Sequence, residues 1–254
     1  MSAAEGVRIR AFSSGAVREK AAQRGPRRYL AGGWAEDTLP VNFFLVEHER
    51  GLCLFDTGQS AAAAKPGYIP RWHPFMRLSR FELTASDEAG AQLRGLGHDP
   101  GDVRWVVLSH LHTDHVGVIE PFSNAEILVT RTEWDRFPGV AGRIRGYLPQ
   151  HWPAGVEPRL VDFEDSPPVG PFAGSLDLAK DGTLLLVPLP LPGHTPGHMG
   201  LLVTGPAGSF LLAGDAAHST REFAESHPRW HEFCREQPAV PLLAHDSDAA
   251  TLVA

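Results

Sequence analysis

Three histidines and one aspartate fall within six residues of the chain. His110 and His112 are two residues apart, so in an extended segment both imidazoles point to the same side. Asp114 and His115 follow, where we expect a turn that leads into a helix. Burying these groups together without a partner would be energetically costly, and a divalent metal ion removes that cost. The segment therefore predicts a metal site.

Three more ligand-type residues stand at corresponding places downstream. His194 follows the apolar residues 183–189, Asp215 follows residues 209–213, and His245 follows residues 240–243. In open α/β sheets, ligands collect at the ends of strands. We therefore expect these three side chains to join the site.

The elements that would position these residues alternate between strands and helices, separated by Gly and Pro. Strands are expected over residues 42–47, 52–55, 103–108, 126–130, 183–189, 201–204, 209–213 and 240–243. Hairpin turns are expected at residues 48–51 and 205–208. Helices are expected over residues 86–96, 131–137 and 221–235, the last with a break at Pro228. This order predicts an α/β fold.

Two long stretches, residues 59–80 and 138–177, have no clear periodicity. They contain several aromatic residues, namely Tyr68, Trp72, Phe75, Tyr147 and Trp152. Loops of this length are commonly lids or binding loops, so these side chains could line an apolar pocket for a substrate. They could equally pack against the surface or form the interface of a homodimer.

The composition narrows the function classes. The chain has 254 residues, which suits one domain over residues 1–254, and its formal net charge of −7 disfavours nucleic-acid binding. A basic cluster near the N-terminus is interpreted as a solvated face, and it comprises Arg18, Lys20, Arg24, Arg27 and Arg28. Two cysteines exclude a disulfide framework. Because neither a signal peptide nor an apolar run of about 20 residues is recognisable, we expect a cytoplasmic protein with no membrane partner.

Five motifs in order resemble the metallo-β-lactamase superfamily. They are Asp-Thr-Gly at 56–58, His-x-His-x-Asp-His at 110–115, Gly-His at 193–194, Gly-Asp at 214–215 and a late histidine at 245. A set of five ordered motifs is far more specific than one short motif. The resemblance implies a four-layer αβ/βα sandwich with a binuclear metal site at one edge.

The resemblance also implies a role for each motif residue. By this analogy His110, His112 and His194 bind the first metal, Asp114, His115 and His245 bind the second, and Asp215 bridges the two. These ligands suit Zn²⁺ best, although iron or manganese could occupy them. Two such ions can share a hydroxide, lower its pKa towards neutrality and polarise a carbonyl oxygen. Asp56 is expected to orient the metal loops by hydrogen bonds, and His198 either does the same or is structural. Six further histidines are interpreted as non-ligands, namely His48, His73, His98, His151, His227 and His231.

Within the superfamily, the chain looks most like the N-acyl-homoserine-lactone lactonase group. The implied reaction is attack of the metal-bridging hydroxide on a lactone carbonyl, with a small lactone or ester as the substrate. That group carries a tyrosine three residues after the bridging aspartate, where this chain has His218. His218 could donate a hydrogen bond or act as acid and base, or it could simply face solvent. Asp114 and His218 are the candidate catalytic residues.

Other activities use the same ligands. A thioesterase resembling glyoxalase II usually has a further helical C-terminal region, whereas only nine residues follow His245 here. A phosphotriesterase or aryl esterase remains open. A mononuclear-iron enzyme resembling persulfide dioxygenases would leave part of the ligand set unused. A silent metal-binding module would be expected to have lost ligands, and none is lost.

Overall fold

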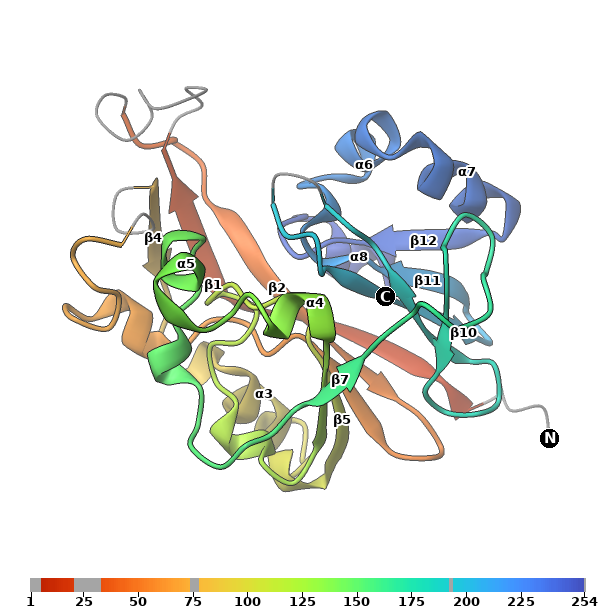
Figure 1. The fold of residues 1–254 in the computed structure, drawn as a ribbon, viewed down its shortest axis with the longest axis horizontal. Coiled ribbons are helices and arrows are strands. Elements are labelled where there is room, and N and C mark those ends of the chain that lie inside the picture. The colour runs from red at the N-terminus through yellow and green to blue at the C-terminus, as the bar shows by residue number, and fades with distance from the viewer. Residues whose placement is uncertain (1–5, 21–32, 74–77, 192–193, 254) are drawn as a thin grey trace.

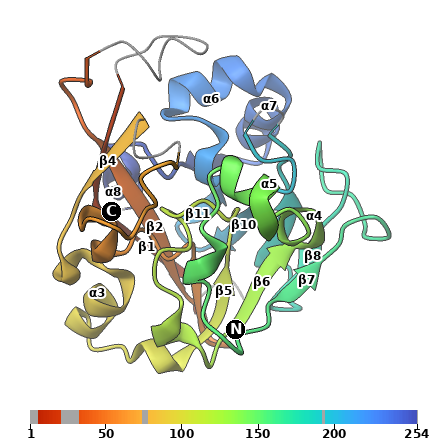
Figure 2. The same cartoon turned by 60° about the vertical axis from the view of Figure 1, so that its left-hand side comes forward.

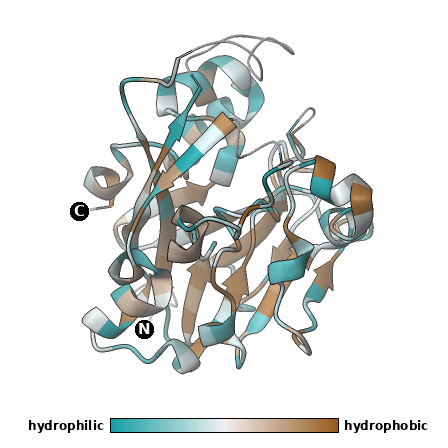
Figure 3. Ribbon diagram, turned by 90° about the vertical axis from the view of Figure 1, so that its left-hand side faces the viewer, coloured by the Kyte–Doolittle hydropathy of each residue, from teal (hydrophilic) through white to brown (hydrophobic). Residues whose placement is uncertain are grey.

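Two β-sheets packed face to face form the centre of the molecule (Figure 1). The computed structural model describes residues 6–20, 33–73, 78–191 and 194–253. Within these ranges one sheet has seven strands and the other has five. Figure 3 shows that the strands are largely hydrophobic, as expected for sheets covered on both faces.

The seven-stranded sheet has the order β4-β1-β2-β3-β5-β6-β7. Its first part is antiparallel, and β3, β5, β6 and β7 run parallel. The strands are β1 (Arg8–Glu19), β2 (Leu39–Glu47), β3 (Leu52–Phe55), β4 (Ser79–Glu82), β5 (Val103–Val107), β6 (Glu126–Thr130) and β7 (Arg159–Val161). The parallel strands β3 and β5 therefore both end at the edge where the metal motif begins.

The five-stranded sheet has the order β12-β11-β10-β9-β8. Its strands are β8 (Leu176–Asp177), β9 (Leu184–Pro188), β10 (Met199–Gly205), β11 (Gly208–Leu212) and β12 (Ala239–Leu242). Neighbours are antiparallel except β11 and β12, which are parallel. Consequently β9, β11 and β12 all run towards the same edge.

Helices cover the outer face of each sheet (Figure 2). Between the sheets, Phe44 and Val107 of one pack in the same cluster as Leu186 and Leu201 of the other. Leu93 of α3 is buried against the outside of the larger sheet. The helices are α3 (Ala89–Gly95), α4 (Arg131–Trp134), α5 (Gly139–Ile144), α6 (Thr220–Ser226) and α7 (Pro228–Glu236). A further helix, α8 (Ala249–Leu252), instead packs against the cluster between the sheets. The predicted four-layer αβ/βα sandwich is confirmed.

Most predicted elements are present with ends shifted by up to three residues. Pro228 separates α6 from α7, as predicted, because proline cannot donate the backbone hydrogen bond that a continuous helix needs. Three predictions were wrong or incomplete. The turn after His115 leads only to a 3₁₀ turn at Glu120–Phe122, and the helix from residue 131 ends at Trp134. The strands β1, β4, β7 and β8 were not foreseen.

The basic cluster is only partly described. Arg18 forms an ion pair with Glu82 across β1 and β4, whereas Arg24, Arg27 and Arg28 lie outside the described residues. Among the helices that the structure describes, none has the length and apolar character required to cross a bilayer.

A buried histidine ties the two sheets together away from the metal motif. His48, in the turn after β2, accepts a hydrogen bond from the Arg50 N–H through Nδ1 (3.0 Å), so its proton is on Nε2. This Nε2 contacts Thr183 Oγ1 at 3.0 Å and Asp181 Oδ2 at 3.3 Å, just before β9. The imidazole therefore joins a hairpin of one sheet to the other sheet.

We predict that His48→Ala destabilises the fold by about 1–3 kcal/mol, since it leaves buried polar partners unsatisfied. Arg50→Ala is the matched control, because Arg50 is half exposed and contacts the same Asp181 at 3.5 Å. Its loss should cost at most about 1 kcal/mol. Urea unfolding measures both changes, and equal stabilities of the two variants would contradict this account.

Candidate metal centre

Four strand ends deliver the predicted ligands to one place between the sheets. The segment containing His110, His112, Asp114 and His115 follows β5. The remaining residues follow β9, β11 and β12 and are His194, Asp215 and His245. The structure therefore brings all seven predicted residues together.

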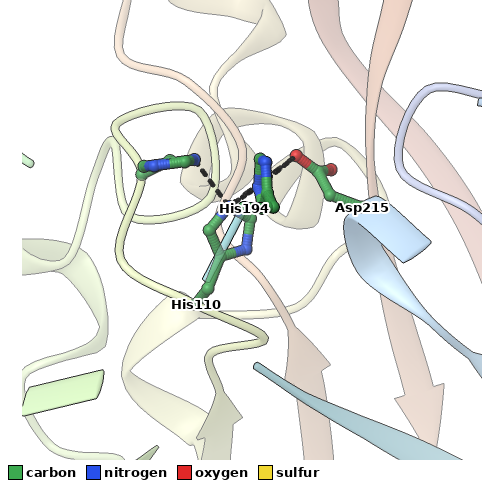
Figure 4. Close-up of side chains that lie close together, drawn as sticks. His110, His194 and Asp215 are labelled. Carbon is green, nitrogen blue, oxygen red and sulfur yellow. Dashed lines mark hydrogen bonds and ion pairs between the residues drawn. The ribbon is translucent and has the colours of Figure 1, made fainter. Parts of the chain in front are cut away.

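The seven side chains form two adjacent groups. His110, His112, His194 and Asp215 offer ligand atoms that all lie within 4.8 Å of one another, and Asp114, His115 and His245 do the same. In the first group, His110 Nε2 lies 3.0 Å from His112 Nδ1 and 3.2 Å from His194 Nε2. Figure 4 shows His110, His194 and Asp215 pointing towards one another.

Asp215 lies between the two groups. Its Oδ2 is 3.2 Å from His194 Nε2 and 3.7 Å from His110 Nε2. Its Oδ1 is 3.1 Å from His115 Nε2 and 3.4 Å from His245 Nε2. One carboxylate thus presents one oxygen to each group, which is the arrangement that a bridging ligand requires.

Backbone carbonyls orient two of the imidazoles. His112 Nε2 lies 3.0 Å from the Arg145 carbonyl oxygen, and His245 Nδ1 lies 2.7 Å from that of Pro40. A carbonyl oxygen only accepts hydrogen bonds, so these outer nitrogens carry the protons. In the neutral form of these imidazoles, the inner nitrogens, His112 Nδ1 and His245 Nε2, carry the lone pairs and face the centre.

Asp56 orients two further imidazoles. It adopts a left-handed backbone conformation (φ 60°), which is uncommon outside glycine. One oxygen accepts the Ser109 N–H at 2.7 Å, and the other lies 2.8 Å from His115 Nδ1 and accepts the Ser109 hydroxyl. Because that hydroxyl is donated to Asp56, Ser109 Oγ accepts from His110 Nδ1 (3.0 Å). Here too the inner nitrogens, His110 Nε2 and His115 Nε2, face the centre.

The pKa shifts reflect this concentration of charged and polar groups. Burial lowers the pKa of His110 and His112 well below the usual value. Burial alone would also lower the pKa of His245 and His115, but nearby carboxylates together outweigh it. Asp215 and Asp114 raise the pKa of His245 to about 9. Asp215 and Asp56 raise the pKa of His115 well above its usual value. Although burial opposes ionisation, these imidazoles hold the pKa of Asp215 well below its usual range. The carboxylates of the centre therefore stabilise positive charge between them.

Two atoms facing the centre lack hydrogen bonds. His115 Nε2 and Asp215 Oδ1 are buried and lie 3.1 Å apart, yet neither makes a hydrogen bond of acceptable geometry within the described ranges. Buried polar atoms are rarely left in this state. Imidazole nitrogens and carboxylate oxygens are the donors that Zn²⁺ and similar divalent ions prefer. The residues present therefore fit divalent cations.

The other candidate residues lie around the centre. His198 is buried behind Asp215 and accepts its backbone N–H through Nε2 (3.3 Å), and burial lowers its pKa to about 3. His218 lies at the rim, with its ring 5.7 Å from that of His245 and half of its side chain exposed. None of the remaining described histidines joins either ligand group.

The aromatic residues of the long loops separate into two sets. Tyr68 and Trp72 line a cavity of about 310 Å³ together with Leu148. Tyr147 is instead fully buried with its ring against His112, and Trp152 packs against Trp134. Phe75 lies outside the described residues.

Sequence reasoning missed one buried acid beside the centre. Glu133, in α4, is completely buried and accepts hydrogen bonds from the Tyr147 hydroxyl (2.6 Å) and the Leu111 N–H (3.2 Å). Burial raises the pKa of Glu133. In sequence it is one acid among many, and only its place on the buried face at the end of β6 could have singled it out.

Comparison with known proteins agrees with this geometry. The model of the metallo-beta-lactamase superfamily matches residues 37–253. The chain belongs to this superfamily. It is 34% identical over 202 residues to an N-acyl homoserine lactonase AttM of Azorhizobium caulinodans, covering 76% of this chain and 71% of the relative. It is 31% identical over 242 residues to the AttM lactonase of Rhizobium radiobacter, covering 86% of each.

Solved structures show the same fold. An N-acyl homoserine lactone hydrolase with N-hexanoyl-L-homoserine at its catalytic metal centre superposes with a TM-score of 0.73 at 20% identity, covering 98% of this chain and 96% of that one. AidC, a dizinc quorum-quenching lactonase, superposes with a TM-score of 0.60 at 17% identity, covering 96% of this chain and 88% of that one. The family match and the AttM relatives confirm the predicted resemblance and a metal-dependent hydrolase activity.

Removal of bound metal should destabilise the protein, because the metal binds the folded ligand set and not the unfolded chain. At a free metal concentration a thousandfold above Kd, the expected loss is about 4 kcal/mol. Urea unfolding before and after treatment with a chelator measures it, and re-addition of Zn²⁺ should restore it. Asp215→Asn should reduce the difference in the free energy of unfolding between the metal-bound and the metal-free protein. Identical stability with and without metal would contradict the metal assignment.

Proposed function

We propose that this chain is a binuclear metal-dependent lactonase that opens a small lactone or cleaves a related ester. The observation that carries the proposal is Asp215, whose two oxygens face two separate groups of donor atoms. The lactonase names of the relatives at 31–34% identity support the substrate class. A single domain over residues 1–254 would hold this activity.

The cations would be held by the two ligand groups. We assign His110, His112 and His194 to one ion, Asp114, His115 and His245 to the other, and Asp215 to both. Zn²⁺ is the proposed metal because of these nitrogen and oxygen donors, and iron or manganese would find compatible ligands. When bound, two such cations lower the pKa of water towards neutrality and polarise a carbonyl oxygen.

The protein supplies orientation around this chemistry. Asp56, Pro40 and Arg145 fix the imidazoles so that their lone pairs face inward. We propose that Asp56 and His198 serve the centre by positioning, His198 through the backbone of Asp215. Neither residue would bind metal itself.

His218 is proposed to touch the substrate. Its backbone N–H donates to Glu222 Oε2 at 2.8 Å, and its Nδ1 lies 3.4 Å from the same oxygen. Glu222 therefore orients the ring and leaves Nε2 for the carbonyl or ring oxygen of a lactone. This is the position at which the lactonase group has a tyrosine.

A cavity between the two long loops is proposed to hold the rest of such a substrate. Tyr68, Trp72 and Leu148 form its apolar part, and the polar side chains of its lining are His73, Arg143, Gln150 and His151. Leu148 follows Tyr147, whose ring packs on His112. We propose that an acyl chain lies there, because small-molecule sites are mostly apolar. The cytoplasmic location, the absence of nucleic-acid partners and the homodimer stay predictions.

Asp114→Ala should lose lactone hydrolysis while the chain still folds, because it removes one ligand of the second group. Elemental mass spectrometry should find about two metal ions in the wild type and about one in the variant. Lactones, thioesters and phosphotriesters are assayed side by side. Full activity of Asp114→Ala would overturn the binuclear proposal, and hydrolysis of thioesters or phosphotriesters alone would overturn the lactonase assignment.

His218→Ala should lower kcat by roughly 10²–10⁴-fold if His218 transfers a proton or hydrogen-bonds in the transition state. His218→Tyr should recover part of the rate, since a phenol can also donate. His231→Ala on α7, outside both ligand groups, is the control and should leave kcat unchanged. A kcat for His218→Ala equal to that of this control would show that His218 only faces solvent.

A further inference from the structure

A buried carboxylate lies directly behind the three-histidine group. Glu133 is 0% exposed, and its Oε1 accepts the backbone N–H of Leu111 at 3.2 Å. Leu111 stands between His110 and His112 in the chain. This hydrogen bond therefore holds the backbone from which both imidazoles project.

The same oxygen controls His112 by a second route. It accepts the Tyr147 hydroxyl at 2.6 Å, and Tyr147 forms an isolated β-bridge with His112. Arg145, two residues before Tyr147, accepts the His112 Nε2–H at 3.0 Å. Glu133 thus anchors the segment that sets the tautomer of His112 and keeps its Nδ1 lone pair on the inner side.

Glu133 also lies against the loop that carries His194, the third histidine of the group. Its N–H donates to Thr130 Oγ1, and that hydroxyl donates to the Gly197 carbonyl oxygen at 2.5 Å. A Cβ on Gly197 would lie 2.5 Å from the Glu133 nitrogen, so only glycine permits this approach. Gly197 follows His194 by three residues, so α4 contacts both segments that carry this ligand group.

The other oxygen of Glu133 indicates that its carboxylate balances a nearby positive charge. Oε2 is buried and has no hydrogen-bond partner within the described residues. A buried negative charge is costly unless positive charge lies nearby. The group in front of it contains three histidines and only a shared carboxylate, whereas the other group has Asp114 as a ligand and Asp56 on His115. A cation among the three histidines would supply the missing positive charge.

We propose that Glu133 is a positioning residue for one cation: it orients His110 and His112 and supplies the negative charge behind the group that they form with His194. Asp56 serves the cation of Asp114, His115 and His245 in the corresponding way. This inference rests on the proposed binuclear centre and adds that each half of the centre has its own buried acid.

Glu133→Gln tests the proposal with little change of shape. Glutamine keeps an acceptor at the Oε1 position and removes the charge. Zn²⁺ binding is titrated against a competing chelator, and ¹¹³Cd NMR reports the two sites separately. The resonances are assigned with His194→Ala and Asp114→Ala. Asp56→Asn is the matched variant for the other half.

Loss of a hydrogen-bonded partner of a metal ligand typically costs 10–100-fold in affinity. We expect Glu133→Gln to weaken binding at the three-histidine site by about that factor and to leave the other site unchanged. Asp56→Asn should weaken the other site most, because Asp56 contacts His115 directly and reaches His110 only through the Ser109 hydroxyl. Unchanged affinity at both sites in Glu133→Gln, or equal loss at both, would overturn the proposal.

Two controls separate this result from other failures. Tyr147→Phe keeps the ring and removes only the hydroxyl, so it should weaken metal binding at the three-histidine site to a smaller extent. If Glu133→Gln does not fold, the affinity of Tyr147→Phe for metal at this site tests the proposal instead. Because the readout is metal affinity, it does not depend on the substrate. A wild type that binds two cations and hydrolyses no lactone would overturn the lactonase assignment alone. A wild type that binds one cation would overturn the binuclear centre and this inference together.

Discussion

The concentration of ionisable groups around Asp215 is the constraint on which the structure depends. Five imidazoles and two carboxylates are gathered between two sheets, where an unpaired polar group is costly. The surrounding residues reduce this cost by giving the outer nitrogens defined partners. Asp56, Ser109 and the carbonyls of Pro40 and Arg145 all serve this purpose. The lone pairs that remain face inward and define a site for cations.

This constraint explains contacts between distant parts of the chain. Asn42 in β2 donates to the carbonyls of Leu243 and Asp246, and Pro40 accepts from His245. The strand that comes early in the chain thus holds the last ligand loop. On the opposite side, α4 connects the His110–His112 segment to the loop that carries His194. The two sheets are therefore joined through the metal loops as well as through the hydrophobic core.

The residues proposed to contact the substrate lie at the rim of the centre. The side chain of His218 is half exposed there. The cavity lined by Tyr68 and Trp72 on one side and by Leu148 on the other belongs to the two long loops rather than to the sheets. Loops carry specificity because they can change without disturbing the core. We expect substrate preference to depend on these rim residues rather than on the metal ligands.

The candidate ligand residues, most strands and the break at Pro228 could be predicted from the sequence, because each is marked by residue types within a short segment. Apolar runs, a proline and closely spaced histidines are local signals. The roles of Glu133 and Tyr147 and the pairing of β1 with β2 and β4 could not be predicted in this way. Glu133 acts on Leu111, 22 residues away, and Pro40 holds His245 from 205 residues away. Only the tertiary structure decided these contacts, since the geometry of a hydrogen bond between distant segments depends on how the whole chain packs.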